Sequence, residues 1–311
     1  MKVIVVGLGV QGHKRQKFAG ADFVASVDPF NQDAHYRTIR DVPLSDYDAA
    51  LCCIPDEPKY EILTYFLENK KHVLVEKPLW VEGADQISQI EALARQNGVV
   101  CYTAYNHRFE PHFVRMHDLI ASGELGRIYS CRMFYGNGTA RLVRNSEWRD
   151  KGAGVLPDLG SHLLDTCRFW FEELKDRFDV AAVNCFENRS PDHVVIANEH
   201  GSCRIELEMT LLSWRNHFTC DISAQNGSAH IDSLCKWGPA TFTKRTRLLP
   251  SGRPPEQACT LIQDDPTWKA EYEHFKRLCE TSATTDLSND LWLGNSLGRL
   301  GRDAVARLLR S

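Results

Sequence analysis

The sequence predicts an α/β protein in two parts: a parallel sheet covered by helices, then an α/β part with a large, mostly antiparallel open sheet. Over the first hundred residues, short and almost continuously apolar segments alternate with helical patterns, as expected for strands buried on both faces. A glycine-rich loop directly follows the first of these segments. Beyond about residue 123, longer segments rich in β-branched and aromatic residues predominate, which favours strands of an antiparallel or mixed sheet.

The first part is expected to contain five strands, each ending near a turn or helix signal. They are Val3–Val6, Phe23–Val27, Ala49–Ile54, His72–Val75 and Val99–Tyr102. Pro58 lies near the start of one helix, and Asn97-Gly98 closes the next,.

The second part is expected to hold an antiparallel or mixed sheet with helices on one face. The predicted strand segments are Arg127–Tyr135, Val180–Phe186, Ser202–Trp214, Phe218–Ala224 and Ala240–Leu248. One closing helix carries Trp268, Tyr272, Phe275 and Cys279, and another runs from about Leu291 to Leu309,. With the boundary between Asn106 and Gly123, we divide the chain into a dinucleotide-binding domain at 1–122 and a second domain at 123–311.

Composition excludes several classes of protein. The chain has 311 residues, which suits two domains,. A net charge of −4 argues against nucleic acid as a partner,. No apolar run reaches the ~18 residues of a membrane span, and the apolar start is too short for a signal peptide,. Eleven cysteines without a Cys-x-x-Cys pair predict reduced thiols in a cytoplasmic protein and no metal site,.

The first motif is Gly7-Leu8-Gly9-Val10-Gln11-Gly12, which follows a strand and opens a helix. In this context the glycines permit a tight turn, a close approach of the backbone to a pyrophosphate, and helix–strand packing. Asp28 ends the second strand, 21 positions after Gly7. It can accept hydrogen bonds from ribose hydroxyls and repel a 2′-phosphate, which favours NAD over NADP; the alternative is a turn aspartate before Pro29.

The second motif lies in the segment 152–165. Asp158, His162 and Asp165 share one helical face, apart from the apolar stripe,. An acid and a histidine one turn apart can cooperate in proton transfer. The alternative is an N-cap aspartate and a surface histidine.

These motifs together resemble the glucose–fructose oxidoreductase / inositol dehydrogenase family (Gfo/Idh/MocA). The resemblance rests on Gly7–Gly12, Asp28, Glu76-Lys77-Pro78, Tyr105–Phe109 and Gly152–Asp165, in the family's order. It implies a Rossmann domain, a substrate-binding and oligomerisation domain, and homodimers or homotetramers packed through the second sheet. It also implies a cis bond between Lys77 and Pro78.

The activity implied by the resemblance is hydride transfer between a nicotinamide cofactor and a secondary alcohol or ketone of a sugar, cyclitol or nucleotide sugar. Lys77 would hydrogen-bond the reacting oxygen, His162 would be the general base, and Asp158 would position the substrate. The implied cofactor-binding residues are Gly7, Leu8, Gly9, Val10, Gln11, Gly12, Asp28, Ile54, Pro55, Glu76 and Lys77, and the substrate-binding residues are Asn106, Arg108, Asp158 and His162.

Two alternatives remain open: a glycosidase of the same family that retains its NAD, and a cofactor-binding sensor without catalysis. A sensor would not need Lys77, Asp158 and His162. The cations Lys236, Arg245, Arg247 and Arg253 could meet a diphosphate, although a solvated basic face is the simpler interpretation. Trp214, Phe218 and Trp237 suggest an apolar open sheet face that a partner subunit would cover,.

Overall fold

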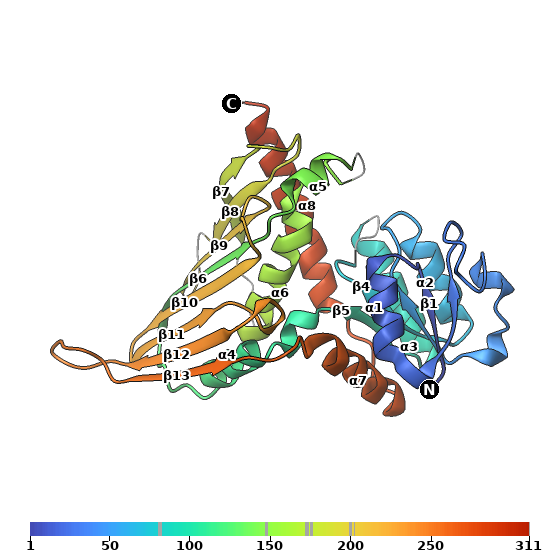
Figure 1. Ribbon diagram of the computed structural model, residues 1–311, viewed down its shortest axis with the longest axis horizontal. Helices are drawn as coiled ribbons and strands as arrows, with labels where there is room; N and C mark the ends of the chain where they lie inside the picture. The colour runs from blue at the N-terminus through green and yellow to red at the C-terminus, as the bar shows by residue number, and fades with distance from the viewer. Residues whose placement is uncertain are drawn as a thin grey trace. The chain divides into compact units, whose positions relative to one another are not determined.

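The computed structural model describes residues 1–79, 83–146, 149–171, 174, 177–198, 201 and 203–310. Ser202, which opens one predicted strand, lies outside the described residues. Two compact units are present: the first comprises 1–106 and 267–294, and the second comprises 107–266 and 295–311. Each contains one sheet (Figure 1), and together these sheets confirm the predicted fold class.

The first unit contains the predicted five-stranded parallel sheet, in the order β2-β1-β3-β4-β5. The strands are β1 (Val3–Val6), β2 (Phe23–Val27), β3 (Ala49–Cys52), β4 (His72–Glu76) and β5 (Cys101–Ala104). The helices of this unit are α1 (Val10–Ala19), α2 (Lys59–Glu68), α3 (Ala84–Asn97), α7 (Thr267–Glu280) and the first turns of α8 (Ser288–Leu308).

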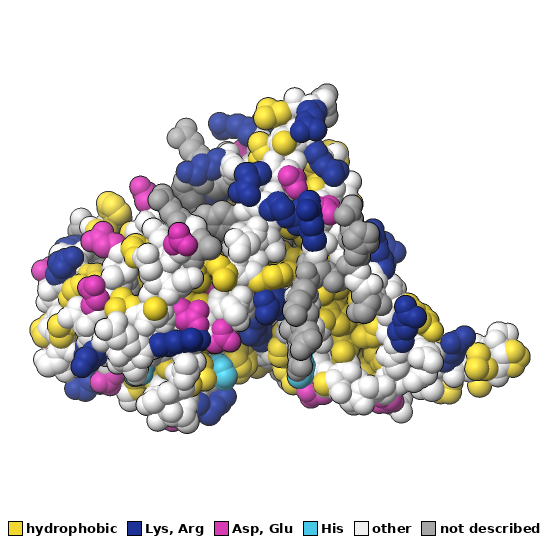
Figure 2. Space-filling view, turned by 180° about the vertical axis from the view of Figure 1, so that it is seen from behind, with side chains coloured by type: hydrophobic (Ala, Val, Ile, Leu, Met, Phe, Trp, Pro, Cys, Tyr) yellow, Lys and Arg dark blue, Asp and Glu magenta, His cyan; other side chains and the backbone are white. Residues whose placement is uncertain are grey.

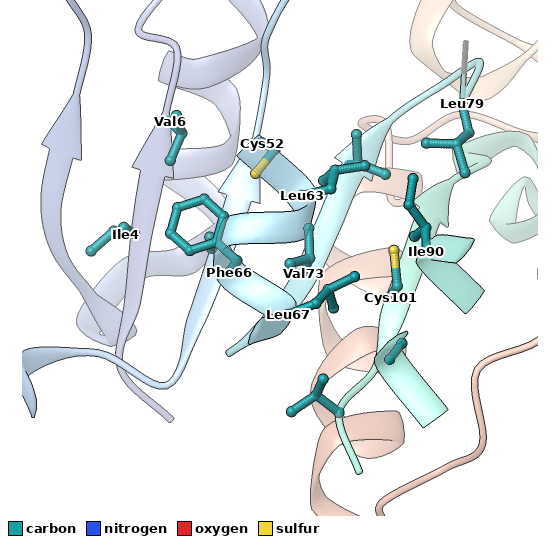
Figure 3. Packing of buried hydrophobic residues seen from close by; sticks show 14 of the residues in the cluster. Ile4, Val6, Cys52, Leu63, Phe66, Leu67, Val73, Leu79, Ile90 and Cys101 are labelled. Atoms are coloured by element: carbon teal, nitrogen blue, oxygen red, sulfur yellow. The ribbon is translucent and has the colours of Figure 1, made fainter. Parts of the chain in front are cut away.

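Both faces of this sheet are buried, which explains its almost continuous apolar strands. On one face, Ile4 and Val6 pack in a cluster with Phe66 of α2 and Ile90 of α3 (Figure 3). The other face packs against α1 and α7, where Phe275 is 0% exposed. Burying one such side chain contributes about 1.5–3 kcal/mol relative to leaving it exposed.

The compact units are discontinuous, in contrast to the contiguous domains 1–122 and 123–311 expected from sequence. Although α7 lies far along the chain, its Tyr272 and Phe275 pack in the core beneath β1 and β3. The chain first leaves this unit after Asn106. The contiguous ranges stay a prediction for the functional domains.

The second unit holds an eight-stranded sheet in the order β13-β12-β11-β10-β6-β9-β8-β7. Its strands are β6 (Ile128–Gly136), β7 (Phe178–Asn184), β8 (His193–Asn198), β9 (Arg204–Thr210), β10 (His217–Ala224), β11 (Gly227–Asp232), β12 (Ala240–Thr246) and β13 (Glu256–Leu261). The pair β6–β9 is parallel and the other pairs are antiparallel. Strands β8, β11 and β13 were not predicted.

Helices α4 (Pro111–Ala121) and α6 (Ser161–Trp170) lie on one face of this sheet, and the short α5 (Ala140–Arg144) follows β6. Figure 1 shows the opposite face without a covering helix. The prediction that Trp214, Phe218 and Trp237 make this face apolar is wrong. Phe218 is fully buried, and Trp237 packs against the buried ring of Tyr135. Of the three predicted aromatic residues, Trp214 alone, after β9, is fully exposed.

The open face instead carries cross-strand ion pairs. Arg132 pairs with Glu206 (3.0 Å), His230 contacts Asp221 (2.6 Å), and Arg245 pairs with Glu256 beyond them (2.7 Å). Strand alternation therefore directs the apolar side chains toward the helices and the charges outward.

Over the first unit, acidic and basic side chains are interspersed on the face that Figure 2 shows. Within the described part of the chain, no helix is both long enough and apolar enough to cross a membrane.

Candidate active site

The glycine loop between β1 and α1 uses its three glycines for different reasons. Gly7 has φ +87°, and a Cβ there would lie 2.3 Å from the carbonyl oxygen of Cys53. A Cβ on Gly12 would lie 2.0 Å from the oxygen of Gly7. A Cβ on Gly9, in contrast, would meet nothing within 4 Å. Protein packing thus requires Gly7 and Gly12, whereas Gly9 leaves open space.

That open space would allow an anion such as a pyrophosphate to approach the backbone. Gly9, Val10 and Gln11 are exposed at the start of α1, whereas Leu8 and Gly12 are buried. Across α1, all of which is described, no side chain caps the N-terminus and no acidic residue occupies the first turn. The backbone N–H groups and positive end of the helix dipole remain available to an anion.

Asp28 is tied to the glycine loop, and it also holds its own turn. Its carboxylate accepts hydrogen bonds from the backbone N–H groups of Leu8 (2.7 Å), Phe30 and Asn31 (both 2.8 Å). Burial raises the pKa of Asp28, but these bonds outweigh it and lower the pKa overall,. The turn interpretation is therefore correct, and the bond to Leu8 places the carboxylate beside the glycine loop. The role of Asp28 toward a ribose stays a prediction.

Sequence reasoning missed a cation near this carboxylate. Arg37 donates from Nη1 to the carbonyl oxygens of Asp28 and Asn31. Arg37 comes close to Asp28 because the preceding residue, Tyr36, forms a β-bridge with Val27 at the end of β2. Ile54 and Pro55 follow β3, with Ile54 partly buried and Pro55 exposed.

The loop Glu76-Lys77-Pro78 begins at the last residue of β4, and the Lys77–Pro78 bond is cis, as predicted. Glu76 accepts a hydrogen bond from Nε of Arg15 (2.7 Å). Nη2 of Arg15 lies 2.7 Å from Oε2 of Glu271, and the guanidinium lies 4.3 Å from the ring centre of Trp268. The resulting Arg15–Glu76–Glu271 cluster anchors the first residue of this loop.

Arg15 is only 1% exposed. Burial lowers the pKa of its guanidinium, but the charges of Glu271 and Glu76 outweigh burial and raise it overall. Arg15 is therefore a fully charged, buried group.

A second buried cation holds the other side of the loop. Lys59, at the first position of α2, is 2% exposed. Its Nζ donates to Oδ1 of Asp56 (2.6 Å) and to the carbonyl oxygen of Pro78 (2.7 Å). A lysine directly after Pro58, at the positive end of a helix, is the sequence signal that could have identified it.

In the second unit, Asp158 and His162 lie where a π-helical turn runs into α6. Asp158 belongs to the π turn Leu156–Gly160, so it is not an N-cap. His162 is 8% exposed, so it is not a surface histidine. The alternative interpretation, an N-cap aspartate and a surface histidine, is therefore wrong for both residues. Single π turns inside helices are rare and often occur at functional sites.

The ring of His162 stacks on His107, with centroids 3.9 Å apart and an interplanar angle of 17°. Tyr135 lies beside both rings. Nζ of Lys236 is 3.4 Å from Nε2 of His107 and 3.4 Å from the Tyr135 hydroxyl. Burial raises the pKa of Tyr135 well above its ordinary value. Sequence reasoning missed His107 and Tyr135.

The remaining candidates separate into different places. Arg108 pairs with the buried Asp165, its Nε lying 3.0 Å from Oδ2. Nδ2 of Asn106 donates to Oγ1 of Thr267 (2.8 Å). Lys236 contacts the His107–His162 cluster, whereas Arg245 pairs on the open sheet face, Arg247 donates to the Gln225 carbonyl, and Arg253 is exposed.

The fold and these motifs define an α/β oxidoreductase family. A sequence model described as "Oxidoreductase family, NAD-binding Rossmann fold" matches residues 1–105, and one described as "GFO/IDH/MocA C-terminal domain" matches residues 113–230. The chain belongs to the Gfo/Idh/MocA family, and its first unit is built on the family's NAD-binding Rossmann domain.

Relatives are distant. An uncharacterized oxidoreductase of Schizosaccharomyces pombe is 24% identical over 196 residues, which cover 56% of this chain and 52% of the relative. Trans-1,2-dihydrobenzene-1,2-diol dehydrogenase of Oryctolagus cuniculus is 28% identical over 179 residues, again 56% and 52%. The chain thus matches about half the length of these curated relatives. The solved structure of levoglucosan dehydrogenase in complex with NADH shares the fold, with TM-score 0.82, 17% identity, and coverage of 98% and 97%.

Proposed function

We propose that this protein is a nicotinamide-dependent dehydrogenase or reductase that acts on a secondary alcohol or ketone of a carbohydrate-type substrate. One observation carries the proposal: the glycine cradle after β1 and Lys77 after β4 lie at the carboxyl ends of strands in one parallel sheet. Cofactors bind outside that edge in such sheets. A relative named for levoglucosan and another named for a dihydrodiol support a polyhydroxylated substrate.

The chemistry divides between the residues as follows. In the oxidation direction, His162 takes the proton of the substrate hydroxyl on a ring nitrogen. The Lys77 ammonium donates a hydrogen bond to the same oxygen and stabilises its developing negative charge. Asp158 orients the substrate. A nicotinamide cofactor, which the Gly7–Gly12 loop and Asp28 would hold, would supply the hydride acceptor for oxidation and the hydride donor for reduction. In the reduction direction His162 returns the proton to the same oxygen.

NAD is the proposed cofactor, because the Asp28 carboxylate would repel a 2′-phosphate. Arg37 would attract such a phosphate and reduce the preference for NAD over NADP. Comparing the specificity constant kcat/KM with NAD and with NADP measures this preference. A higher kcat/KM with NADP than with NAD would show that the proposal for Asp28 is wrong. Asp28→Ser should reduce the ratio of kcat/KM with NAD to kcat/KM with NADP.

A homodimer or homotetramer through the open face of the second sheet is also proposed. Because that face carries charged side chains, any ion pairs formed between subunits there would weaken as salt screens the charges,. Light scattering at micromolar concentration measures this. A monomer at low salt contradicts the proposed assembly.

The deciding experiment compares His162→Ala and Lys77→Ala with the native protein. First, a screen of free sugars, cyclitols and nucleotide sugars, followed by absorbance of the reduced cofactor, identifies a substrate. His162→Ala should then lower kcat by about 10²–10⁴-fold and leave NAD affinity nearly unchanged. Lys77→Ala should cost at least as much.

His112→Ala is the matched control, because His112 is a buried histidine in the same unit that contacts the Ala240 carbonyl. It should alter stability and leave turnover nearly unchanged. Near-normal kcat in a folded, NAD-binding His162→Ala protein would overturn the assignment of the base. The same result for Lys77→Ala would overturn the dehydrogenase proposal. Product formed without net NADH would instead indicate the NAD-retaining glycosidase.

A further inference from the structure

Lys59 occupies a position that is unfavourable for folding. Its ammonium is buried at the first position of α2, where the helix dipole disfavours a cation,. Burial is the largest cause that lowers the pKa of Lys59, the carboxylate of Asp56 opposes this, and the charge of Lys77 adds to the lowering. A residue that served only to begin this helix would not carry a buried positive charge there.

The contacts of Lys59 lead to the loop that carries Lys77. Its two hydrogen bonds go to Asp56, three residues before it, and to the carbonyl oxygen of Pro78, the residue after Lys77. On the other side of Lys77, Arg15 holds Glu76. The residues on both sides of Lys77 are therefore tied to buried cations: Arg15 holds the side-chain carboxylate of Glu76, and Lys59 holds the backbone carbonyl of Pro78.

We propose that Lys59 is a positioning residue that fixes the peptide following Lys77, so that the Lys77 amine is presented at a defined place. This inference rests on the proposed function, in which Lys77 donates a hydrogen bond to the reacting oxygen. Displacing a reacting group by about 1 Å costs on the order of 10²-fold in rate. Loss of Lys59 should have an effect of that size on kcat, with little effect on NAD affinity.

A matched control lies in the same unit. Lys71 also donates to two oxygen atoms, the carbonyls of Leu44 (2.6 Å) and Tyr47 (2.7 Å), and it precedes β4 at the opposite end of the strand from Lys77. Lys71→Met and Lys59→Met each remove one ammonium and two hydrogen bonds. Only Lys59→Met releases the loop.

The experiment compares Lys59→Met, Lys59→Arg, Lys71→Met and Lys77→Ala in the full chain. It measures kcat on the substrate found by the screen, the Kd of NAD, the midpoint of thermal unfolding, and the rate at which trinitrobenzenesulfonate labels Lys77, read by peptide mapping. Lys59→Met should lower kcat by about 10²-fold, leave the Kd nearly unchanged, and accelerate labelling of Lys77 because its loop is released. Lys59→Arg, which keeps a donor, should recover part of kcat. Lys71→Met should change the melting temperature and neither kcat nor labelling.

Native kcat and native labelling in Lys59→Met would overturn the inference. So would equal losses of kcat in Lys59→Met and Lys71→Met, because the effect would then be one of general stability. Native turnover in Lys77→Ala would overturn the proposed function instead, whereas accelerated labelling in Lys59→Met would still support the positioning of Lys77. The two failures are therefore distinguishable.

Discussion

Replacement of Arg15 by methionine should strongly destabilise the first unit. Arg15 lies 2.7 Å from both Glu76 and Glu271, and its methionine replacement would leave Glu271, which is 0% exposed, without its cation. At an effective dielectric constant of about 20, one charge pair at that distance attracts by about 6 kcal/mol, most of which the burial of the charges offsets. Removing one partner of a buried pair costs about 3–5 kcal/mol, and we expect a loss of that size.

Urea unfolding followed by far-ultraviolet circular dichroism measures this loss for Arg15→Met. Adding Glu271→Gln should recover part of it, because the substitution removes the uncompensated carboxylate. The exposed pair Arg40–Glu61, 3.8 Å apart, supplies the control: Arg40→Met should cost less than about 1 kcal/mol,. A loss below about 1 kcal/mol for Arg15→Met would refute the reasoning that the Arg15–Glu76–Glu271 cluster holds the loop of Lys77 in place.

Three other outcomes are expected. Phe275→Ala should lower the free energy of unfolding by about 3–5 kcal/mol in urea, since the ring is fully buried beneath the first sheet; a loss under 1 kcal/mol would contradict that packing,. Because its three backbone bonds lower the pKa of Asp28, the stability that Asp28 contributes is present above the unfolded pKa of about 3.9 and lost as the pH falls through the folded value,. Urea midpoints of Asp28→Asn should therefore lie below native at pH 7 and converge on it in acid, and a constant difference would argue against this origin. His107→Ala should lower kcat without changing the Kd of NAD, because it removes the ring stacked on His162; unchanged turnover would show that the stack has no role in catalysis.

Local sequence patterns were sufficient to predict a helix or strand where its residues are buried on all sides, or where buried and exposed residues alternate regularly. Most strand residues of the first sheet are buried on both faces, so their continuous apolar runs predicted the strands. The Gly7–Gly12 loop marked where a helix must follow β1. The apolar stripe of α6, including Leu163 and Trp170, likewise predicted its buried face. By contrast, β11 (Gly227–Asp232) is a short segment of mostly small and polar residues, and its alternation was too brief to separate it from a turn.

The sequence predicted only part of the candidate site, for a related reason. Lys77, Asp158 and His162 were found through motifs, and their catalytic roles stay predictions. Arg15 and Lys59 were missed, because an isolated charged residue in a sequence is expected to be solvated.

What the sequence determined by itself was the periodicity of each segment and the residues that no other type can replace, such as Gly7 at its positive φ. Tertiary structure alone decided which distant segments share a core. The pattern of α7 predicted a helix with one apolar face, but not that this face packs beneath β1 and β3. The same folding brings Glu271 to Arg15 and Pro78 to Lys59. The periodicity of a helix or strand depends on neighbours two to four residues away. Burial and pairing of a charge depend instead on which distant segments the folded chain brings together.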